Sequence, residues 1–316
     1  ITCLCSALIT IFIYFRHSKL NFKPGEYRNV LKSATPITGV RLASSLVQPL
    51  TTLIIPSMLI LSGYSTSEAV SSFGVIMGMT FPMLFVPMSI IGSISMVLIP
   101  SISSMMSQKQ YNTIQENVTK SIDVSVFISM LFIPLYLSVG DLIGLVLYDN
   151  ALSGVLLQLS AVCVLPITLC NLTGSILNAL NLEVKSFINY IIGSAVLFAS
   201  LIIFTPMLGI NSVIISQLLS MGTISLLNIR KIKKVLPDLK FNLIQTTFKY
   251  SLIVIPSSLL GHFISNISLV VFNNFISACI GGGISIVATV VLCKIFKLYD
   301  FSQLLSIIKK KNRKNT

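Results

Sequence analysis

The stretch FGVIMGMTFPMLFVPMSIIGSISMVLIPS, residues 73–101, contains no charged side chain and exceeds the roughly 20 apolar residues that carry a helix across a bilayer. The whole chain has the same character. Of its 316 residues, 54% are hydrophobic and 10% are charged, and the mean hydropathy is +0.91. Soluble domains have about a quarter of their residues charged. The sequence therefore predicts an all-α integral membrane protein.

Nine stretches of the chain have the length and composition of membrane spans. They are Ile1–Phe15, Thr35–Leu61, Phe73–Ser101, Ile122–Val139, Leu152–Leu180, Phe187–Thr205, Asn211–Asn228, Tyr250–Val271 and Phe275–Cys293. The chain begins with Ile1 rather than Met, inside the first apolar stretch and without the features of a signal peptide. We therefore expect about nine transmembrane helices, the first truncated, in the C-terminal portion of a longer chain.

Lysine and arginine are confined to alternate connections between these spans. All of them except Arg41 follow the first, third, fifth, seventh or ninth span or lie at the edge of those spans. The other connections carry only the acids Glu68, Asp141 and Asp149. Positively charged loops stay on the cytoplasmic side of a membrane. The alternation therefore predicts a multi-pass protein of the plasma membrane with a cytoplasmic C-terminus.

The net charge of +13 is accounted for by this topology. Because the bases are spread over several connections, they form no single basic stripe for a nucleic acid, and we expect membrane lipids as partners instead. Near the C-terminus, Leu298, Phe301, Leu305 and Ile308 recur at helical spacing before Lys309–Lys311. This pattern indicates an amphipathic helix on the inner leaflet, with a solvated tail as the alternative. The oligomeric state does not follow from the sequence.

Arg41 is the one charged residue well inside a predicted span. Inserting a charge at that position costs at least about 2.5–3.5 kcal/mol of free energy, so the residue is a candidate for a functional role. Polar residues recur at three- and four-residue steps from it, at Thr38, Ser45, Gln48 and Thr52. Such a stripe faces protein or water, so we predict that these five residues line a substrate cavity in which Arg41 meets an anionic group such as a pyrophosphate. The alternative is that Arg41 extends to the cytoplasmic headgroups.

Prolines are concentrated in the second and third spans. Each one removes a backbone donor and loosens the helix, and bent helices at mid-membrane are typical of transporters. We therefore predict that these residues form hinges, the alternative being that prolines are simply common in membrane helices. The hinge candidates are Pro36, Pro49, Pro56, Pro82 and Pro87.

The remaining motifs point away from an enzyme. Gly74 and Gly78 are four residues apart, which predicts close helix packing, and Gly281–Gly283 lacks the context of a phosphate-binding loop. All carboxylates lie in connections or at the ends of spans, and no paired carboxylates or nucleophile–base set occurs. The six cysteines lack the spacing of a metal site. We expect no catalytic residues, no metal and no cofactor.

Three stretches carry a resemblance to a known family. They are LKSATPITGVRLASSLVQPLTTLIIPSMLILSG at residues 31–63, GVIMGMTFPMLFVPMSIIGSISMVLIPSIS at residues 74–103 and PITLCNLTGSILNAL at residues 166–180. They resemble the polysaccharide-exporter branch of the multidrug/oligosaccharidyl-lipid/polysaccharide flippase superfamily, and within it the group of stage V sporulation protein B. The third stretch is similar to the tenth span of that family.

The resemblance implies a division of the chain. Proteins of this family have fourteen helices, arranged as two six-helix lobes around a central cavity with two extra helices. By this likeness, residues 1–15 end helix six, 35–229 form the second lobe and 250–293 are the two additional helices. The rest is cytoplasmic and basic: a loop at 16–34, a loop at 230–249 and the tail at 294–316.

The resemblance also implies a function. It implies a flippase that moves a lipid-linked oligosaccharide, such as an undecaprenyl-pyrophosphate-linked peptidoglycan or polysaccharide precursor, by alternating access in spore or cell-wall assembly. The alternative is a cation-coupled multidrug exporter of the same superfamily. The basic Arg41 and the lack of acids inside the spans disfavour cationic drugs, which need carboxylates.

The predicted orientation can be tested by labelling two connections in a variant without the six native cysteines. A cysteine at Ser67, in a connection that carries only an acid, should react with an impermeant maleimide added to intact cells. A cysteine at Gln108, beside Lys109, should react only after the cells are permeabilised. Labelling of Ser67 only from the cytoplasm would overturn the topology.

Overall fold

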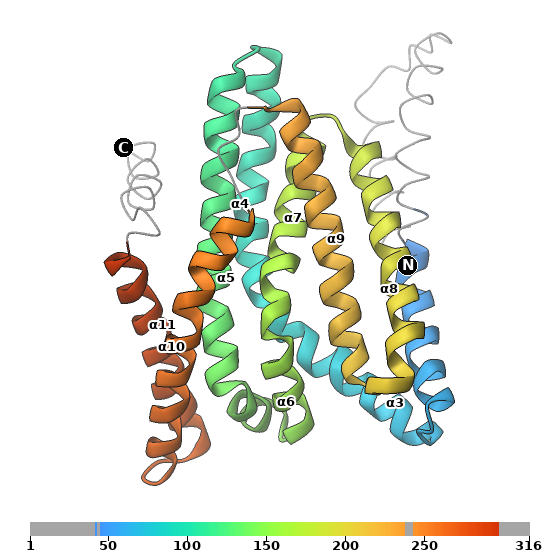
Figure 1. Ribbon diagram of the computed structural model, residues 1–316, viewed down its shortest axis with the longest axis vertical. Coiled ribbons are helices and arrows are strands. Elements are labelled where there is room, and N and C mark those ends of the chain that lie inside the picture. The colour runs from blue at the N-terminus through green and yellow to red at the C-terminus, as the bar shows by residue number, and fades with distance from the viewer. Residues whose placement is uncertain (1–41, 43–44, 238–242, 297–316) are drawn as a thin grey trace, which may run out of the picture. The chain divides into compact units, whose positions relative to one another are not determined.

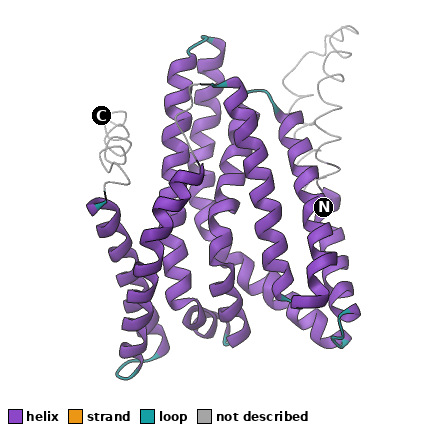
Figure 2. Ribbon diagram, viewed as in Figure 1, coloured by secondary structure: helices purple, strands orange, loops and turns teal. Residues whose placement is uncertain are grey.

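A computed structural model of the protein describes residue 42, residues 45–237 and residues 243–296. The chain divides into two units, Ile1–Ala43 and Ser44–Thr316, and every described residue except Leu42 belongs to the second. Figure 2 shows the secondary structure of this second unit as helices joined by short loops, with no strand in the described ranges. This confirms the predicted all-α class.

The helices of this unit begin with an unlabelled helix over Ser45–Leu61. A π-helical turn (η1) and a 3₁₀ turn (η2) interrupt two of the later helices. The labelled elements are α3 Thr66–Val75, η1 Ile76–Thr80, α4 Phe81–Ser107, α5 Tyr111–Tyr148, α6 Ala151–Ser160, η2 Ala161–Cys163, α7 Val164–Ala179, α8 Glu183–Leu208, α9 Asn211–Val235, α10 Leu243–Leu269 and α11 Asn274–Ile295.

Seven helical stretches among the described residues are long and apolar enough to cross a membrane. They run over Thr66–Ser107, Tyr111–Tyr148, Ala151–Ala179, Glu183–Leu208, Asn211–Val235, Lys249–Leu269 and Asn274–Ile295. Each coincides with one of the predicted spans from the third to the ninth, so the protein is a multi-pass membrane protein. The predicted span Ile1–Phe15 and the first part of Thr35–Leu61 lie outside the described residues.

The helices extend beyond the apolar cores from which they were predicted. Prediction placed one span at Ile122–Val139, whereas α5 has 38 residues. Its length of about 57 Å exceeds the bilayer core of about 30 Å. The extension before Ile122 is mainly polar, and there Lys120 Nζ lies 2.6 Å from Glu116 Oε1, whereas the extension after Val139 is mostly apolar. Apolar composition marks the part of a helix that lies in lipid, whereas backbone hydrogen bonds continue into water.

Basic residues gather at one end of the described unit. The α4–α5 and α7–α8 connections and the last turn of α9 lie at the upper end in Figure 1, and α11 runs from the lower end to about mid-height. The connections after the Ser45–Leu61 helix, α5, α8 and α10 lie at the lower end. The α4–α5 and α7–α8 segments and the last turn of α9 carry Lys109, Lys185 and Lys234, and the last turn of α11 carries Lys294. The connections that carry lysine and the connections that carry only acids therefore lie at opposite ends of the helical bundle.

The α10–α11 pair packs mainly against α5, at a break in that helix. The backbone leaves helical geometry at Val139, with φ −132° and ψ 15°. His262 of α10 meets the freed backbone there, since its Nδ1 lies 3.1 Å from the Ser138 carbonyl oxygen. Asn266 Nδ2 lies 3.2 Å from the other ring nitrogen of His262. Both polar atoms of the ring are therefore satisfied.

Glycines allow this close approach. A Cβ on Gly281 would lie 2.5 Å from the Ser265 Cβ and 2.9 Å from the Gly261 carbonyl oxygen. At Gly74 and Gly78, by contrast, a Cβ would meet no described atom within 4 Å. The predicted close packing at Gly74 and Gly78 is therefore wrong for the described part of the chain. The spacing of small residues marks a face that permits close contact, but it does not supply the facing helix.

A matched pair of substitutions tests this contact. Gly281→Val should destabilise the protein by about 1–3 kcal/mol, since the side chain has no room between α10 and α11. Gly283→Val, two residues away with nothing within 4 Å of its added Cβ, should leave stability nearly unchanged. The thermal unfolding midpoint in detergent measures both. Equal midpoints for the two variants would contradict the packing.

Candidate functional site

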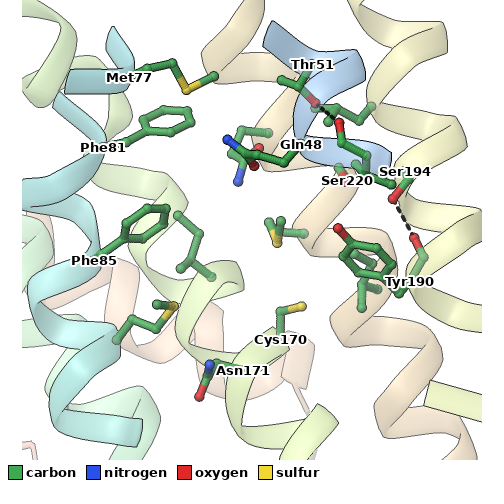
Figure 3. A pocket seen from close by; sticks show the side chains of 17 residues that line it. Gln48, Thr51, Met77, Phe81, Phe85, Cys170, Asn171, Tyr190, Ser194 and Ser220 are labelled. Carbon is green, nitrogen blue, oxygen red and sulfur yellow. Dashed lines mark hydrogen bonds between the residues drawn. The ribbon is translucent and has the colours of Figure 1, made fainter. Parts of the chain in front are cut away.

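A cavity of about 330 Å³ lies among five segments of the unit. The helix Ser45–Leu61, the η1–α4 stretch, α7, α8 and α9 each contribute side chains to its wall. Figure 3 shows two unlike sides, with Phe81 and Phe85 on one and Gln48, Ser220 and Tyr190 on the other. The volume is in the lower part of the range of ligand sites, about 300–1,000 Å³.

The aromatic side follows from helical spacing. Met77, Phe81, Phe85 and Met88 are three or four residues apart along η1 and α4, so they share one face. The rings of Phe81 and Phe85 pack edge to face, with centroids 6.1 Å apart. This side therefore offers ring faces and soft thioethers rather than hydrogen bonds.

The backbone of this wall is irregular at two hinge candidates. The π-helical turn Ile76–Thr80 directly precedes Pro82, and the Phe81 N–H donates to the Ile76 carbonyl five residues back. Pro87 has no N–H for the Met83 carbonyl, and Tyr136 of α5 donates its hydroxyl to that oxygen at 2.6 Å. The deviation from α-helix is thus stabilised from outside the helix.

The other hinge candidates are placed differently. Pro49 and Pro56 lie inside the unbroken helix Ser45–Leu61, and Pro36 lies outside the described residues. Two of the five candidates, Pro82 and Pro87, thus belong to the helix that carries the aromatic wall, although neither lines the cavity. Their role as hinges stays a prediction.

The polar side of the cavity presents three carboxamides from three helices. Gln48 comes from the Ser45–Leu61 helix, Asn171 from α7 and Gln217 from α9. None of the three side chains forms a hydrogen bond with another described residue. Gln48 is exposed, and Asn171 and Gln217 are half-buried. An amide offers both donors and acceptors. These three groups are therefore available to a ligand or to water.

The hydroxyl groups of the wall are already engaged as donors. Thr51 donates to the Val47 carbonyl at 2.8 Å, and Ser194 donates to the Tyr190 carbonyl at 2.9 Å. Ser220 donates across to the Gly193 carbonyl at 2.8 Å and so ties α9 to α8. Each hydroxyl oxygen keeps acceptor capacity toward the cavity.

A hydrogen-bonded chain fixes the three helices α7, α8 and α9 relative to one another. Asn189 of α8 donates its Nδ2 to Asn228 Oδ1 of α9 at 2.9 Å. Asn228 donates its own Nδ2 to Thr173 Oγ1 of α7 at 3.2 Å. Buried hydrogen-bonded chains of this kind favour one arrangement of the helices, because breaking any one bond leaves a buried polar group without a partner. The positions of Asn171 and Gln217 are held in this way.

The predicted polar stripe is only partly at the cavity. Gln48 lines it, whereas Thr52 is exposed and donates to the Gln48 carbonyl at 3.0 Å. Ser45 is exposed and is not part of the wall, and Thr51 takes the position expected of Thr52. Thr38 and Arg41 lie outside the described residues. The helix is rotated by its buried aliphatic residues, since Ile55 and Leu59 lie in line with Thr51.

The sequence contained a signal for the residues that were not predicted. Asn171 and Gln217 are amides inside otherwise apolar spans, where a polar group is expensive and hence informative. The prediction of cavity residues considered only the helix that contains Arg41. None of the residues lining this cavity is Lys, Arg, His, Asp or Glu. The described residues also contain no group of three or more His, Cys, Asp or Glu side chains that would hold a metal.

Comparison with known proteins finds a curated relative. Over 245 residues the chain is 22% identical to stage V sporulation protein B of Bacillus subtilis (strain 168), a match that covers 73% of this chain and 47% of the relative. The chain thus spans about half the length of the curated relative that it matches. No family model and no solved structure matches it. The match confirms the similarity to stage V sporulation protein B expected from the sequence.

Proposed function

We propose that this chain forms the second six-helix lobe and two additional helices of a flippase. The flippase moves a lipid-linked oligosaccharide across the plasma membrane by alternating access. The observation that carries the proposal is the cavity with three unpaired carboxamides inside a bundle of membrane-spanning helices. In lipid, polar groups without partners are costly, so such a cavity has its use in holding a polar substrate or water on the way across.

The packing of the helices supports this division of the chain. The segment from Ser45 to Val235 encloses the cavity with its own helices. The α10–α11 pair has its main contacts with α5 and contributes nothing to the described wall. A six-helix lobe with two accessory helices accounts for both facts.

The irregular backbone of the η1–α4 wall supports a moving part. A π-helical turn followed by Pro82 and Pro87 places weak points in the helix directly behind Phe81 and Phe85. In alternating access, one bundle rocks against another around a central site, and such points absorb the change. Pro82 and Pro87 are therefore the hinge candidates with an irregular helix at or beside them.

The charge distribution supports a cytoplasmic C-terminus. The basic α4–α5 and α7–α8 connections and the basic end of α9 lie at one end of the unit, and α11 runs toward that end with Lys294 in its last turn (Figure 1). That end faces the cytoplasm, where lysine and arginine are retained during insertion and where anionic lipids contact them. The curated relative is a sporulation protein by name. From the resemblance of the sequence to polysaccharide exporters, we propose a peptidoglycan or polysaccharide precursor of the spore or cell wall as the substrate.

A cation-coupled multidrug exporter is the second candidate. The aromatic and methionine side of the cavity favours it, since such surfaces accept varied apolar ligands. The lack of a carboxylate in the described wall counts against a cationic drug. Uptake of ethidium into cells separates the two, because a drug exporter lowers its accumulation and an oligosaccharide flippase leaves it unchanged.

The proposed flippase activity predicts the effect of removing the charge at position 41. The full-length protein is reconstituted in vesicles with a fluorescent lipid-linked precursor. The substitution Arg41→Ala should slow translocation of this precursor by about tenfold or more. One charge-assisted contact to a phosphate is worth roughly 1.5–3 kcal/mol.

The matched control is Lys185→Ala, which removes a base at the start of α8. This variant should translocate the precursor at nearly the rate of the unaltered protein. If the unaltered protein moves no precursor, the proposed function is wrong. If both variants translocate at the full rate, Arg41 has no part in it.

A further inference from the structure

We infer that the cavity wall formed by Gln48, Asn171, Gln217 and the Phe81–Phe85 pair is a subsite for the uncharged sugar part of the substrate, and that the pyrophosphate is held elsewhere. The inference rests on the proposed function and makes it more specific. It assigns the two chemically different parts of the headgroup to different places along the path.

The described wall of the cavity offers no charged group to a pyrophosphate. Phosphate oxygens are bound in proteins by arginine, lysine, metal ions or rows of backbone N–H groups. None of the residues that line the described cavity is a lysine, arginine or histidine. An unpaired phosphate placed here would lose its hydration without gaining a counter-charge, which is strongly unfavourable.

The carboxamides have the chemistry that a sugar needs. Hydroxyl and acetamido groups each present a donor and an acceptor, and so does every Asn or Gln side chain. Gln48, Asn171 and Gln217 approach from three separate helices and have no partner among the described residues. Gln48 and Asn171 lie toward different ends of the cavity in Figure 3, so the amides can contact successive sugar units rather than one ring.

The opposite side suits the rest of a sugar ring. A hexose has faces made of C–H groups between its hydroxyls, and these pack against aromatic rings. Phe81 and Phe85 stand across the cavity from Gln48 in Figure 3. An apolar side facing an amide side matches a ring whose faces are apolar and whose edge is polar. A cationic or purely apolar ligand would leave one of the two sides unused.

The size of the cavity favours part of a substrate rather than the whole. About 330 Å³ is near the lower limit for sites that enclose a complete small molecule. A lipid-linked oligosaccharide is far larger. The cavity therefore takes sugar units from the end of the headgroup, while the lipid and the phosphates extend beyond it.

The test compares two ligands that differ only in the sugar. The probes are undecaprenyl pyrophosphate carrying a disaccharide and undecaprenyl pyrophosphate alone, and binding to the purified protein is measured for both. Gln48→Leu, Asn171→Leu and Gln217→Leu should each weaken binding of the disaccharide-bearing lipid by about three- to tenfold. Binding of the bare pyrophosphate should change by less than about twofold.

The control is Gln108→Leu, which removes the same chemical group from the exposed end of α4. This variant should bind both probes as the unaltered protein does. Thermal midpoints of all four variants show whether each is folded, and a variant with a lowered midpoint is replaced at the same position by Gln→Met or Asn→Met. Equal weakening for both probes, or none for either, would overturn the subsite.

A third measurement separates the two hypotheses. At one concentration, the free disaccharide should raise the thermal midpoint of the unaltered protein by more than that of Gln48→Leu. If it does so while the vesicles show no translocation, the sugar subsite stands and the flippase proposal fails. If translocation occurs but the three variants lose both lipid probes equally, the flippase proposal stands and the subsite fails.

Discussion

Backbone hydrogen bonding in lipid is the constraint on which the rest of this structure depends. Every N–H and C=O within the hydrocarbon must find a partner, which restricts the spans to helices and makes each interruption costly. Where Pro87 cannot donate, Tyr136 of α5 supplies a hydroxyl to the Met83 carbonyl. Where α5 leaves helical geometry at Val139, His262 of α10 meets the Ser138 carbonyl. The irregular points of one helix are thus also its points of attachment to another.

The same constraint explains why the cavity is informative. Most hydroxyl groups inside the bundle donate back to a carbonyl of their own helix, as Thr51 does to Val47 and Ser194 to Tyr190. Such bonds satisfy the side chain without requiring anything from outside. The carboxamides of Gln48, Asn171 and Gln217 have no such partner among the described residues. They keep donors and acceptors free for a polar group that enters the cavity.

Much of the fold was predictable because the length of an apolar stretch and the charge of a loop are local properties of the chain. The seven spans from Phe73 onward needed no tertiary information. The cavity was less accessible, because Thr51 and Thr52 are adjacent in sequence and only the packing of Ile55 and Leu59 decides which one faces inward. Likewise, Gly74 and Gly281 look equally suited to close packing, and only Gly281 has a helix against it. The residues of one helix determine which surface that helix presents. Which helix packs against this surface depends on the whole fold.

The attachment of α10 and α11 chiefly to α5 has a consequence for how the protein is made. The helices from Ser45 to Val235 are synthesised first, and chains are completed from the N-terminus. Helices that are inserted singly associate afterwards within the bilayer. The small-residue surface of α5 around Ser138 therefore stays uncovered until α10 and α11 have been inserted. Docking of α10 and α11 therefore follows the synthesis of every described segment that lines the cavity, and neither helix of the pair supplies a residue to that wall.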